Sequence, residues 1–212
     1  VALILMMLVC GFAHAEDTSI AYIQEKGTFI LGLDDSFPPM GFRDENNEIV
    51  GFDIDVAKVV AEKLGVEFQA QPIDWAAKEL ELNAKNIDCI WNGFTANTSD
   101  TDGVARSEKV DFSYYYMTNA QCIVRRADAT DISTTAGFDG KTVAYESSSA
   151  GQGYVDGITG NINKKGVAAQ MDALLAVKAG TADFAVVDIL LAQSIVGKGD
   201  YSTLAINTGI EI

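Results

Sequence analysis

Short apolar runs that suit buried strands alternate with amphipathic helical stripes over the first half of the chain. The runs typical of strands are residues 28–33, a short hairpin at 42–50, 66–71 and 87–91. The helical stripes are residues 18–26, 53–64 and 74–85. Strands that alternate with helices in this way predict a parallel sheet with helices packed on its faces.

The same alternation restarts in the second half of the chain. The predicted strands are 120–125, 141–145 and 182–187, the helices are 172–179 and 189–196, and a polar connector covers 127–140. We therefore predict two α/β lobes, the first at 16–119 and the second at 120–205, with 206–212 beginning the return to the first lobe. Two lobes whose polar rims face each other form a cleft, which is the usual place for a small polar ligand.

Polar residues gather where the predicted strands end. In a parallel sheet, ligands lie beyond the carboxyl ends of the strands. Asp34, the turn 72–75 and the loop 92–95 follow the three strands of the first lobe. In the second lobe, the run ESSSAG at 146–151 follows one strand and Asp188 follows another. Hydroxyl and small residues before a helix suit anion binding at the helix N-terminus, but the lysine and glycine spacing of a nucleotide site is missing.

A single arginine, Arg106, follows the loop 92–95 in an acidic and hydroxyl-rich stretch. A guanidinium is a fork donor for a carboxylate, and free backbone amides at a strand end would fix the angle of a small carboxylate ligand. The alternative is that Arg106 is a solvated surface residue. The residues alone leave both interpretations open.

Residues 1–15, VALILMMLVCGFAHA, differ from the rest of the chain because they are mostly apolar and carry no acidic residue, lysine or arginine. They end in Ala13-His14-Ala15, a small-x-small cleavage site, so we predict an export signal that is cut after Ala15. The segment is too short to span a membrane. Cys10 raises the alternative of a lipoprotein, but Val9 stands where a small residue is expected, so we favour a soluble periplasmic protein. An ordinary N-terminal strand is the remaining interpretation.

Composition narrows the possible partners and chemistry. The net charge of −15 and the pI of about 4.3 argue against nucleic acid or an anionic membrane surface as a partner. The only histidine, His14, leaves with the predicted signal, which excludes a His-based metal site and a Ser-His-Asp or Cys-His centre from the mature protein. Cys89 and Cys122 either pair or stay as buried free thiols. We expect no metal and no cofactor.

Several motifs follow one another in a specific order and spacing. They are LDDSFPP at 33–39, VGFDID at 50–55, IWNGFT at 90–95, Arg106 six residues before Phe112-Ser113, GKTVA at 140–144 and ADFAVVD at 182–188. Together they resemble the extracellular solute-binding proteins of family 3, the periplasmic receptors of ABC importers for amino acids. The resemblance covers Gly27 to Asn207. It implies a type II two-lobed α/β fold, with a sheet flanked by helices in each lobe and a two-segment hinge at 117–122 and 204–208.

The resemblance also implies roles for the candidate ligand-binding residues. These residues are Asp34, Phe37, Trp75, Asn92, Gly93, Thr95, Arg106, Ser149, Ala150 and Asp188. Arg106 would clamp the α-carboxylate of the ligand, helped by the backbone amides of Thr95 and of residues 149–150. The α-ammonium would meet the Gly93 carbonyl, the Thr95 hydroxyl and Asp188.

The ligand side chain would lie between Phe37 and Trp75 and would end at Asp34, the leading specificity residue. Each role has a structural alternative. Asp34 would otherwise stabilise its own turn, Trp75 would be a core aromatic residue, and Asp188 would cap the helix that follows it. Trp91 lies inside a predicted strand, so we expect it in the core.

Two features depart from the family pattern. The loop 96–105 before Arg106 is longer and more acidic than usual. The sequence stops at Ile212, where the family would cross back to the first lobe and add helices there. We therefore expect the C-terminal part of the first lobe to be missing from this sequence.

The function implied by the resemblance is that of a receptor for an ABC importer. It would capture an amino acid in the cleft, close around it and deliver it to a membrane permease. Asp34 disfavours an acidic side chain, so we expect a polar or cationic ligand, with glutamine or a basic amino acid ahead of cystine. We expect a monomer without a nucleic-acid partner and without enzymatic activity. The alternatives are a periplasmic dehydratase for prephenate-like substrates, with Glu146 or Asp188 as general acid, and a ligand-sensing domain of a larger receptor.

Overall fold

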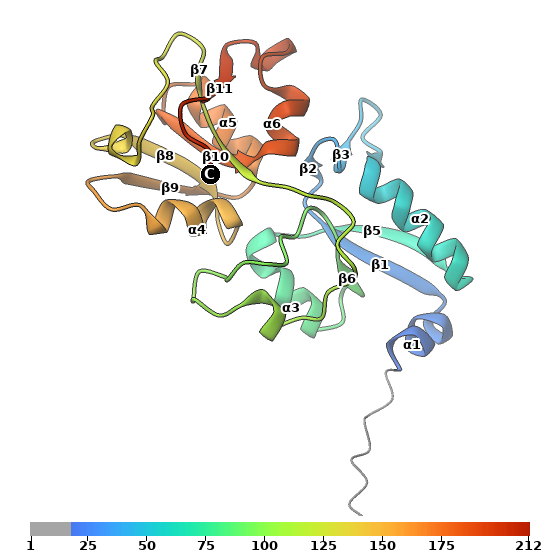
Figure 1. Cartoon of the computed structure of the whole chain (residues 1–212). Helices are drawn as coiled ribbons and strands as arrows, with labels where there is room; N and C mark the ends of the chain where they lie inside the picture. Colours follow the sequence, from blue (N-terminus) through green and yellow to red (C-terminus); the bar gives the residue numbers. More distant parts are fainter. Residues whose placement is uncertain (1–17) are drawn as a thin grey trace, which may run out of the picture.

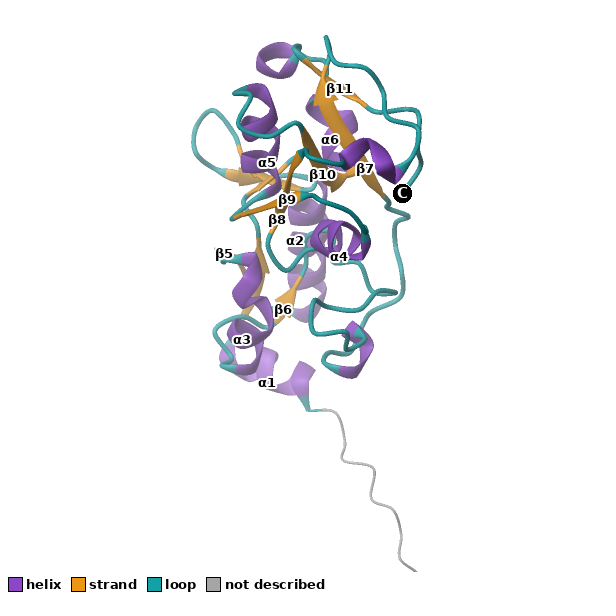
Figure 2. Ribbon diagram, turned by 90° about the vertical axis from the view of Figure 1, so that its left-hand side faces the viewer, coloured by secondary structure: helices purple, strands orange, loops and turns teal. Residues whose placement is uncertain are grey.

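The computed structural model describes residues 18–212, which form two α/β lobes (Figure 1). The predicted export signal at 1–15, with the lipoprotein alternative at Cys10, lies outside these residues. Each lobe has a sheet with helices packed against it, and the lobes lie one above the other when the molecule is turned (Figure 2). The two-lobed α/β architecture predicted from the sequence is confirmed.

The first lobe is built on a parallel sheet in the order β5-β1-β6. Its strands are β1 (Thr28–Leu33), β5 (Glu67–Pro72) and β6 (Cys89–Ile90). A small antiparallel sheet consists of β2 (Ser36–Phe37), β3 (Gly41–Arg43) and β4 (Ile49–Val50). The helices are α1 (Ser19–Lys26), α2 (Phe52–Leu64) and α3 (Lys78–Asn83), with the 3₁₀ turns η1 (Trp75–Ala77) and η2 (Arg106–Glu108).

The second lobe has a mixed sheet in the order β11-β7-β10-β8-β9. Its strands are β7 (Gln121–Arg126), β8 (Thr142–Glu146), β9 (Asn163–Val167), β10 (Phe184–Asp188) and β11 (Leu204–Ile206). Strands β8, β9 and β10 run parallel to one another, whereas β7 runs antiparallel to both of its neighbours. The helices are α4 (Ala150–Gly157), α5 (Gln170–Lys178) and α6 (Ile189–Ile195), with the 3₁₀ turns η3 (Thr135–Phe138) and η4 (Gly199–Tyr201).

Local sequence explains where several helices begin and end. Helix α2 stops because Gly65 adopts a left-handed φ of 74°, which glycine accepts without steric cost. Asp74 caps η1 by accepting a hydrogen bond from the Ala76 N–H at 2.9 Å. Ser149 caps α4 in the same way, since its hydroxyl accepts from the Gln152 N–H at 3.2 Å. Two of these caps adjoin residues expected to bind the ligand, so local signals help to position the site.

Strand β9 is absent from the sequence-based prediction. Its sequence, NKKGV, carries two lysines and a glycine and lacks an alternating apolar pattern. It pairs only with β8 at the edge of the sheet, where charged residues are tolerated and protect against aggregation. The predicted helix at 74–85 also differs from the structure, because it divides into η1 and α3.

The last residues of the chain lie against the second lobe. Strand β11 runs beside β7 with Ile206 opposite Val124, so one predicted hinge segment pairs with residues just after the other. The Asn207 side chain then accepts from the Ile132 N–H at 2.7 Å and donates to the Ile132 carbonyl at 2.9 Å. The sequence predicts that 206–212 begin the return to the first lobe, but these paired bonds hold the segment on the second. The division of the chain at residues 119 and 205 stays a prediction.

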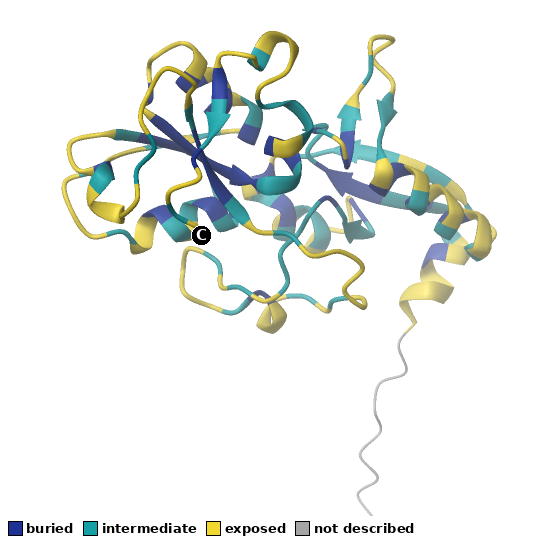
Figure 3. Cartoon of the chain, turned by 45° about the horizontal axis from the view of Figure 1, so that its top comes forward, coloured by how far each residue is buried: buried dark blue, intermediate teal, exposed yellow. Residues whose placement is uncertain are grey.

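Apolar packing fills each lobe and also joins the two. Figure 3 shows buried strands at the centre of the molecule and exposed loops around them. Phe37 and Met40 of the first lobe belong to the same buried cluster as Leu191 of α6. Across the same boundary, the Ser194 hydroxyl donates to the Pro38 carbonyl at 3.1 Å. The lobes therefore contact each other directly, which is the closed arrangement of a hinged pair.

The two cysteines of the described chain are both free. Cys89 lies in β6 of the first lobe, and Cys122 lies in β7 of the second. Burial raises the pKa of each thiol to about 12, so both stay protonated and unreactive at neutral pH. Of the two alternatives left open by the sequence, the structure shows free thiols.

Candidate functional site

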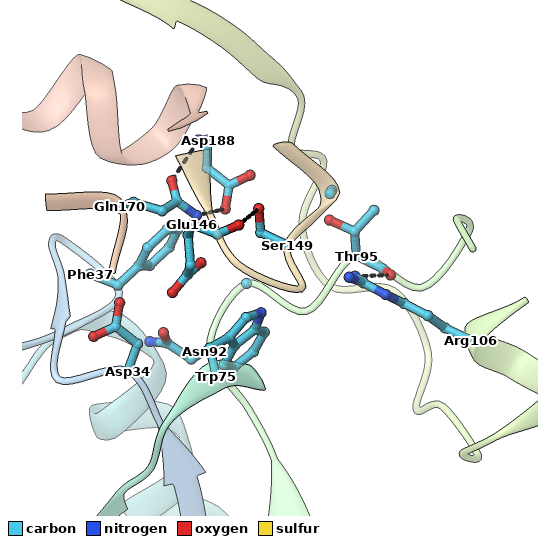
Figure 4. A pocket seen from close by; sticks show the side chains of 12 residues that line it. Asp34, Phe37, Trp75, Asn92, Thr95, Arg106, Glu146, Ser149, Gln170 and Asp188 are labelled. Atoms are coloured by element: carbon cyan, nitrogen blue, oxygen red, sulfur yellow. Dashed lines mark hydrogen bonds between the residues drawn. The ribbon is translucent and has the colours of Figure 1, made fainter. Parts of the chain in front are cut away.

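Polar side chains from both lobes meet at the carboxyl ends of the parallel strands (Figure 4). Asp34 directly follows β1, and Asn92 lies two residues after β6. From the second lobe, Glu146 is the last residue of β8 and Asp188 is the last residue of β10. These strand ends line one cavity between the lobes, as expected for ligands of parallel sheets.

All ten residues predicted to bind the ligand line this cavity. Gln170, which the sequence does not indicate, and Glu146, which it indicates only as a general acid of the enzyme alternative, line it as well. The ten are Asp34, Phe37, Trp75, Asn92, Gly93, Thr95, Arg106, Ser149, Ala150 and Asp188. The fold therefore brings together residues from distant parts of the chain. Their individual contacts with a ligand stay a prediction.

Arg106 is buried in the wall of the cavity, with 2 % of its side chain exposed. Its Nε donates to Asp100 at 2.8 Å, and a terminal nitrogen donates to the Thr95 carbonyl at 3.0 Å. The other terminal nitrogen lies 3.4 Å from the Ser148 carbonyl of the second lobe. The guanidinium also lies 4.6 Å from the centroid of the Phe94 ring. These contacts exclude the interpretation of Arg106 as a solvated surface residue.

The long acidic loop before Arg106 supplies the carboxylate that holds this arginine. Asp100 accepts hydrogen bonds from both Arg106 and Lys109, the latter at 2.9 Å. Burial opposes ionisation of Asp100, but the hydrogen bonds from the two cations hold its pKa below the usual value. The departure from the family pattern at 96–105 therefore still places a fixed guanidinium at the cavity.

Aromatic side chains form another part of the cavity wall. Phe37 is 2 % exposed and Trp75 is 6 % exposed, and Trp75 packs edge-on against Phe94 with ring centroids 5.7 Å apart. Gly93 has a φ of 64°, and a Cβ atom there would lie 3.1 Å from the Phe37 ring. Glycine is therefore needed at 93 both for the backbone conformation and for the close approach of Phe37.

Asp188 is a buried carboxylate and Asp34 is a half-buried one, and the two differ in how they are hydrogen-bonded. Asp34 Oδ1 accepts from the Ser36 N–H at 2.9 Å and hydroxyl at 2.7 Å, whereas its Oδ2 has no partner in the described chain. Asp188 accepts from the Gln170 amide at 3.0 Å and from the Gln121 amide. Burial raises the pKa of both carboxyls, and these hydrogen bonds limit the rise.

These contacts also address the structural alternatives for the two aspartates. Asp34 does stabilise its turn through Ser36, but one of its oxygens remains available. Asp188 stands at the start of α6, yet its side chain makes no capping hydrogen bond. Both carboxylates also line the cavity, so neither is explained by local structure alone.

Glu146 is another buried carboxylate, which the sequence indicates as a polar strand end and as a general acid of the dehydratase alternative, not as a ligand-binding residue. It is 3 % exposed, and its Oε1 has no hydrogen-bond partner in the described chain. Burial, with the negative charges of Asp34 and Asp188, raises its pKa well above the usual value. Within residues 18–212, no group of three or more His, Cys, Asp or Glu side chains is arranged to hold a metal ion.

The amino end of α4 forms the opposite edge of the cavity through Ser149 and Ala150. The Ser149 hydroxyl donates to the Glu146 carbonyl at 2.7 Å while it caps the helix. Ser148, just before it, has a left-handed φ of 59°, which is uncommon for serine. The amino end of a helix carries a partial positive charge, so this edge suits a ligand carboxylate.

Lys78 is a buried cation that the sequence-based prediction missed, because it lies in a helical stripe among residues expected to be exposed. It is 1 % exposed, and burial lowers its pKa. Its Nζ donates to the Ser148 carbonyl of the second lobe at 3.2 Å and to the Trp75 carbonyl at 3.3 Å. Lys78 and Arg106 therefore reach the same carbonyl across the boundary between the lobes.

Replacing Lys78 by methionine is expected to weaken ligand binding about tenfold, since hydrogen bonds from charged groups contribute about 1.5–3 kcal/mol. Methionine keeps much of the side-chain volume but cannot bond to the Ser148 carbonyl, so the closed form loses stability relative to the open form. Calorimetric titration measures the affinity. Lys164→Met serves as the control, because Lys164 is exposed and pairs with Asp156 away from the cavity. Equal affinities of K78M and the wild type would show that this bond does not stabilise closure.

A larger groove of about 640 Å³ lies on the first lobe, beside β6 and residues 110–119. Its lining includes Trp91 and the exposed Tyr114 and Tyr115, and it is mostly apolar. Trp91 itself packs against the core of the first lobe, as predicted, but it is only partly buried. Because charged strand ends from both lobes converge on the smaller cavity, we assign the functional site there.

Two α/β lobes closed over a polar cavity of strand ends define the class of two-lobed solute-binding proteins with the type II fold. Within this class, residues 29–210 match the bacterial extracellular solute-binding proteins, family 3, and the chain belongs to that family. The resemblance recognised from the sequence is confirmed.

Several relatives and solved structures are similar to the chain. The L-cystine-binding protein TcyJ of Escherichia coli (strain K12) is 29 % identical over 210 residues, which cover 97 % of this chain and 74 % of that protein. The arginine-binding extracellular protein ArtP of Bacillus subtilis (strain 168) is 29 % identical over 66 % of this chain and 50 % of its own length. The arginine-bound form of truncated ArgBP from T. maritima has a TM-score of 0.81 and 34 % identity, covering 91 % of this chain and 87 % of that one. An ABC uptake transporter substrate-binding protein from Streptococcus pneumoniae with bound histidine has a TM-score of 0.79 and 30 % identity, and the match covers 93 % of this chain and 81 % of that one.

Proposed function

We propose that this protein is the receptor of an ABC importer and that it captures an amino acid with a cationic side chain between its lobes. The observation that carries the proposal is the charge distribution of the cavity. Arg106 lies in the wall contributed by the first lobe, and the carboxylates of Asp34, Glu146 and Asp188 also line the cavity, with Glu146 and Asp188 buried. An amino acid offers one carboxylate for the arginine and a positive ammonium for a carboxylate.

The α-groups of the ligand account for Arg106 and Asp188. The guanidinium would hold the α-carboxylate, together with the amino end of α4. Asp188 would hold the α-ammonium beside the Gly93 carbonyl and the Thr95 hydroxyl. Arg106 and Asp188 belong to different lobes, so a zwitterion bound to both favours the closed form over the open one.

The ligand side chain would lie between Phe37 and Trp75 and end at Asp34. A carboxylate with a buried, unpaired oxygen at that end favours a positive group over a neutral one. The relatives include an L-cystine-binding and an arginine-binding protein, and one similar structure holds histidine. These names support an amino-acid ligand, and the charge of this cavity favours a basic one.

The proposed receptor needs a membrane partner and a location where it meets its ligand. The closed form would dock on a membrane permease outside the cytoplasm, in agreement with the extracellular character of the family. No helix within residues 18–212 is long and apolar enough to cross a membrane. We propose that the protein acts as a monomer and binds its ligand without changing it chemically.

A thermal-shift screen of the mature protein against the twenty amino acids tests this function. Binding stabilises the folded state by about 4 kcal/mol at a thousandfold excess of ligand over Kd. The largest shift is expected with a basic amino acid, and calorimetric titration then gives the affinity. No shift with any amino acid would overturn the proposal and direct attention to other small organic acids and to the dehydratase alternative.

A further inference from the structure

Glu146 has one oxygen in the cavity for which neither the described chain nor the α-groups of an amino acid provide a partner. Its Oε1 is buried without a hydrogen bond in the described chain, although the residue is only 3 % exposed. Figure 4 shows its side chain on the same side of the cavity as Asp34. Asp34 Oδ2 likewise has no partner. Two carboxyl groups from opposite lobes therefore each leave one oxygen unpaired in the same cavity.

Neighbouring carboxylates in a desolvated cavity are unstable when both are ionised. Lys78 and Arg106 are the nearby cations, but both direct donors to the Ser148 carbonyl, and Arg106 also bonds to Asp100. A metal ion is not an adequate partner either, because no metal-binding group of side chains occurs within residues 18–212. The negative charge of Asp34 and Glu146 is therefore balanced by the ligand or by a proton.

We propose that Glu146 determines ligand specificity: with Asp34 it holds the cationic end of the ligand side chain, and in the empty cavity the pair holds a proton that this cation replaces. This inference rests on the proposed function, because it concerns the ligand of the same cavity. Asp34 belongs to the first lobe and Glu146 to the second. The side chain of the ligand thus forms a second link between the lobes, in addition to its α-groups.

The environment of Glu146 determines whether the affinity for a cationic ligand rises or falls with pH. The groups that face Glu146 are Asp34 after β1, Asp188 at the end of β10, Gln170 at the start of α5 and Lys78 at the start of α3. Burial and the two aspartates favour the protonated form, whereas the Gln170 hydrogen bond and the Lys78 charge favour ionisation. The empty protein therefore binds more protons than the complex does. By linkage, the affinity for a cationic ligand rises with pH until the pair has lost its proton, and then levels off.

Arginine and citrulline provide matched probes, since they have the same length and differ in carrying a guanidinium or a neutral urea group. Calorimetric titration of the wild type is expected to show arginine binding about a hundredfold more tightly than citrulline. Glu146→Gln keeps the size and polarity of the side chain but removes its charge. It is expected to reduce the ratio of the two affinities about tenfold or more. Asp172→Asn is the control, because Asp172 acts electrostatically on Asp34 from α5 without lining the cavity.

The outcomes separate this inference from the proposed function. An unchanged affinity ratio in E146Q overturns the inference, as does a wild type that binds a neutral amino acid better than arginine and lysine. The second result also overturns the cationic ligand of the proposed function, whereas an amino-acid receptor remains in both cases. A wild type that binds no amino acid overturns the function and the inference together.

A second measurement needs no variant and so does not depend on how E146Q folds. Arginine is titrated into the wild type from about pH 5 to pH 8, in two buffers that differ in ionisation enthalpy. Affinity is expected to rise with pH by up to about tenfold per unit where one proton is exchanged, and protons are expected to be released to the buffer. Affinity that is independent of pH over this range, with no proton release, overturns the proton-holding pair.

Discussion

Arg106→Ala is expected to raise the dissociation constant for the amino-acid ligand by a factor between about thirty and several thousand. Removing one partner of a buried, hydrogen-bonded charge pair costs about 2–5 kcal/mol, and each 1.4 kcal/mol is about a factor of ten. The guanidinium is already fixed by Asp100 and the Thr95 carbonyl, so little ordering is needed when a carboxylate binds. Calorimetric titration with the ligand found in the screen measures the loss.

Two further variants show whether the effect comes from the fork of donors. Arg106→Lys keeps the charge but loses the bidentate geometry, so its affinity is expected to lie between those of the wild type and R106A. Arg126→Ala removes an exposed arginine that pairs with Asp128, and wild-type affinity is expected. If R106A is folded and binds as well as the wild type, the ligand carboxylate is held elsewhere, with the amino end of α4 as the next candidate.

The parts of the site that follow from sequence are those next to the ends of apolar runs. Asp34, Asn92 and Asp188 each follow such a run, and parallel strands bring their ends to one edge. Arg106 was identified by its spacing from residues 112–113 in the family pattern, since nothing in its own loop distinguishes it from a surface arginine. The fold supplies the missing information, because it buries the side chain against Asp100 and the neighbouring lobe.

The sequence does not indicate Glu146 as a ligand-binding residue or Lys78 as a site residue of any kind, and the reason is the same for both. Their environments come from residues far away along the chain: Lys78 bonds to Ser148, 70 positions later, and Glu146 faces Asp34. A charged residue beside other polar residues looks exposed in a one-dimensional pattern. Only the packing of one lobe on the other makes these two groups buried.

Strand β9 shows a different limit of structure prediction from sequence. Its two lysines and glycine oppose strand propensity, and β8 alone provides its backbone partners. The register of β8 and β9 places Lys164 opposite Val143, so tertiary pairing overrides the local preference. The core strands β1 and β10 were predictable because their burial leaves an apolar signature, whereas an edge strand need not leave one.

The charges of the cavity suggest how ligand chemistry drives closure. The first lobe contributes Arg106 and Asp34, and the second contributes Asp188 and Glu146. Under the proposed function, each lobe therefore holds part of the α-groups and part of the side chain of one ligand. A ligand that lacks the distal charge would stabilise closure less, because a conformational equilibrium shifts only by the difference in affinity between its two states.

Asp188→Asn is the second large change, and it is expected to raise the dissociation constant on the order of a hundredfold. The substitution keeps the shape of the side chain but removes the negative charge that would hold the α-ammonium. Asp188 is 5 % exposed, and ionisation at this position is opposed by burial. An amide can still accept one of the hydrogen bonds from Gln170 and Gln121, so we expect the empty protein to stay folded. Calorimetric titration gives the affinity, and thermal unfolding without ligand gives the stability.

Asp183→Asn makes a matched control on the same segment of chain. Asp183 lies just before β10, at the end away from the cavity, and its half-exposed side chain pairs with Lys141. D183N removes the same charge from the same lobe and is expected to bind the ligand as the wild type does. If D188N also retains wild-type affinity, the ammonium does not meet this carboxylate, and the ligand does not link the two lobes through Arg106 and Asp188. If D188N loses affinity while its unfolding temperature is maintained, the charge of Asp188 acts on the ligand and not on the fold.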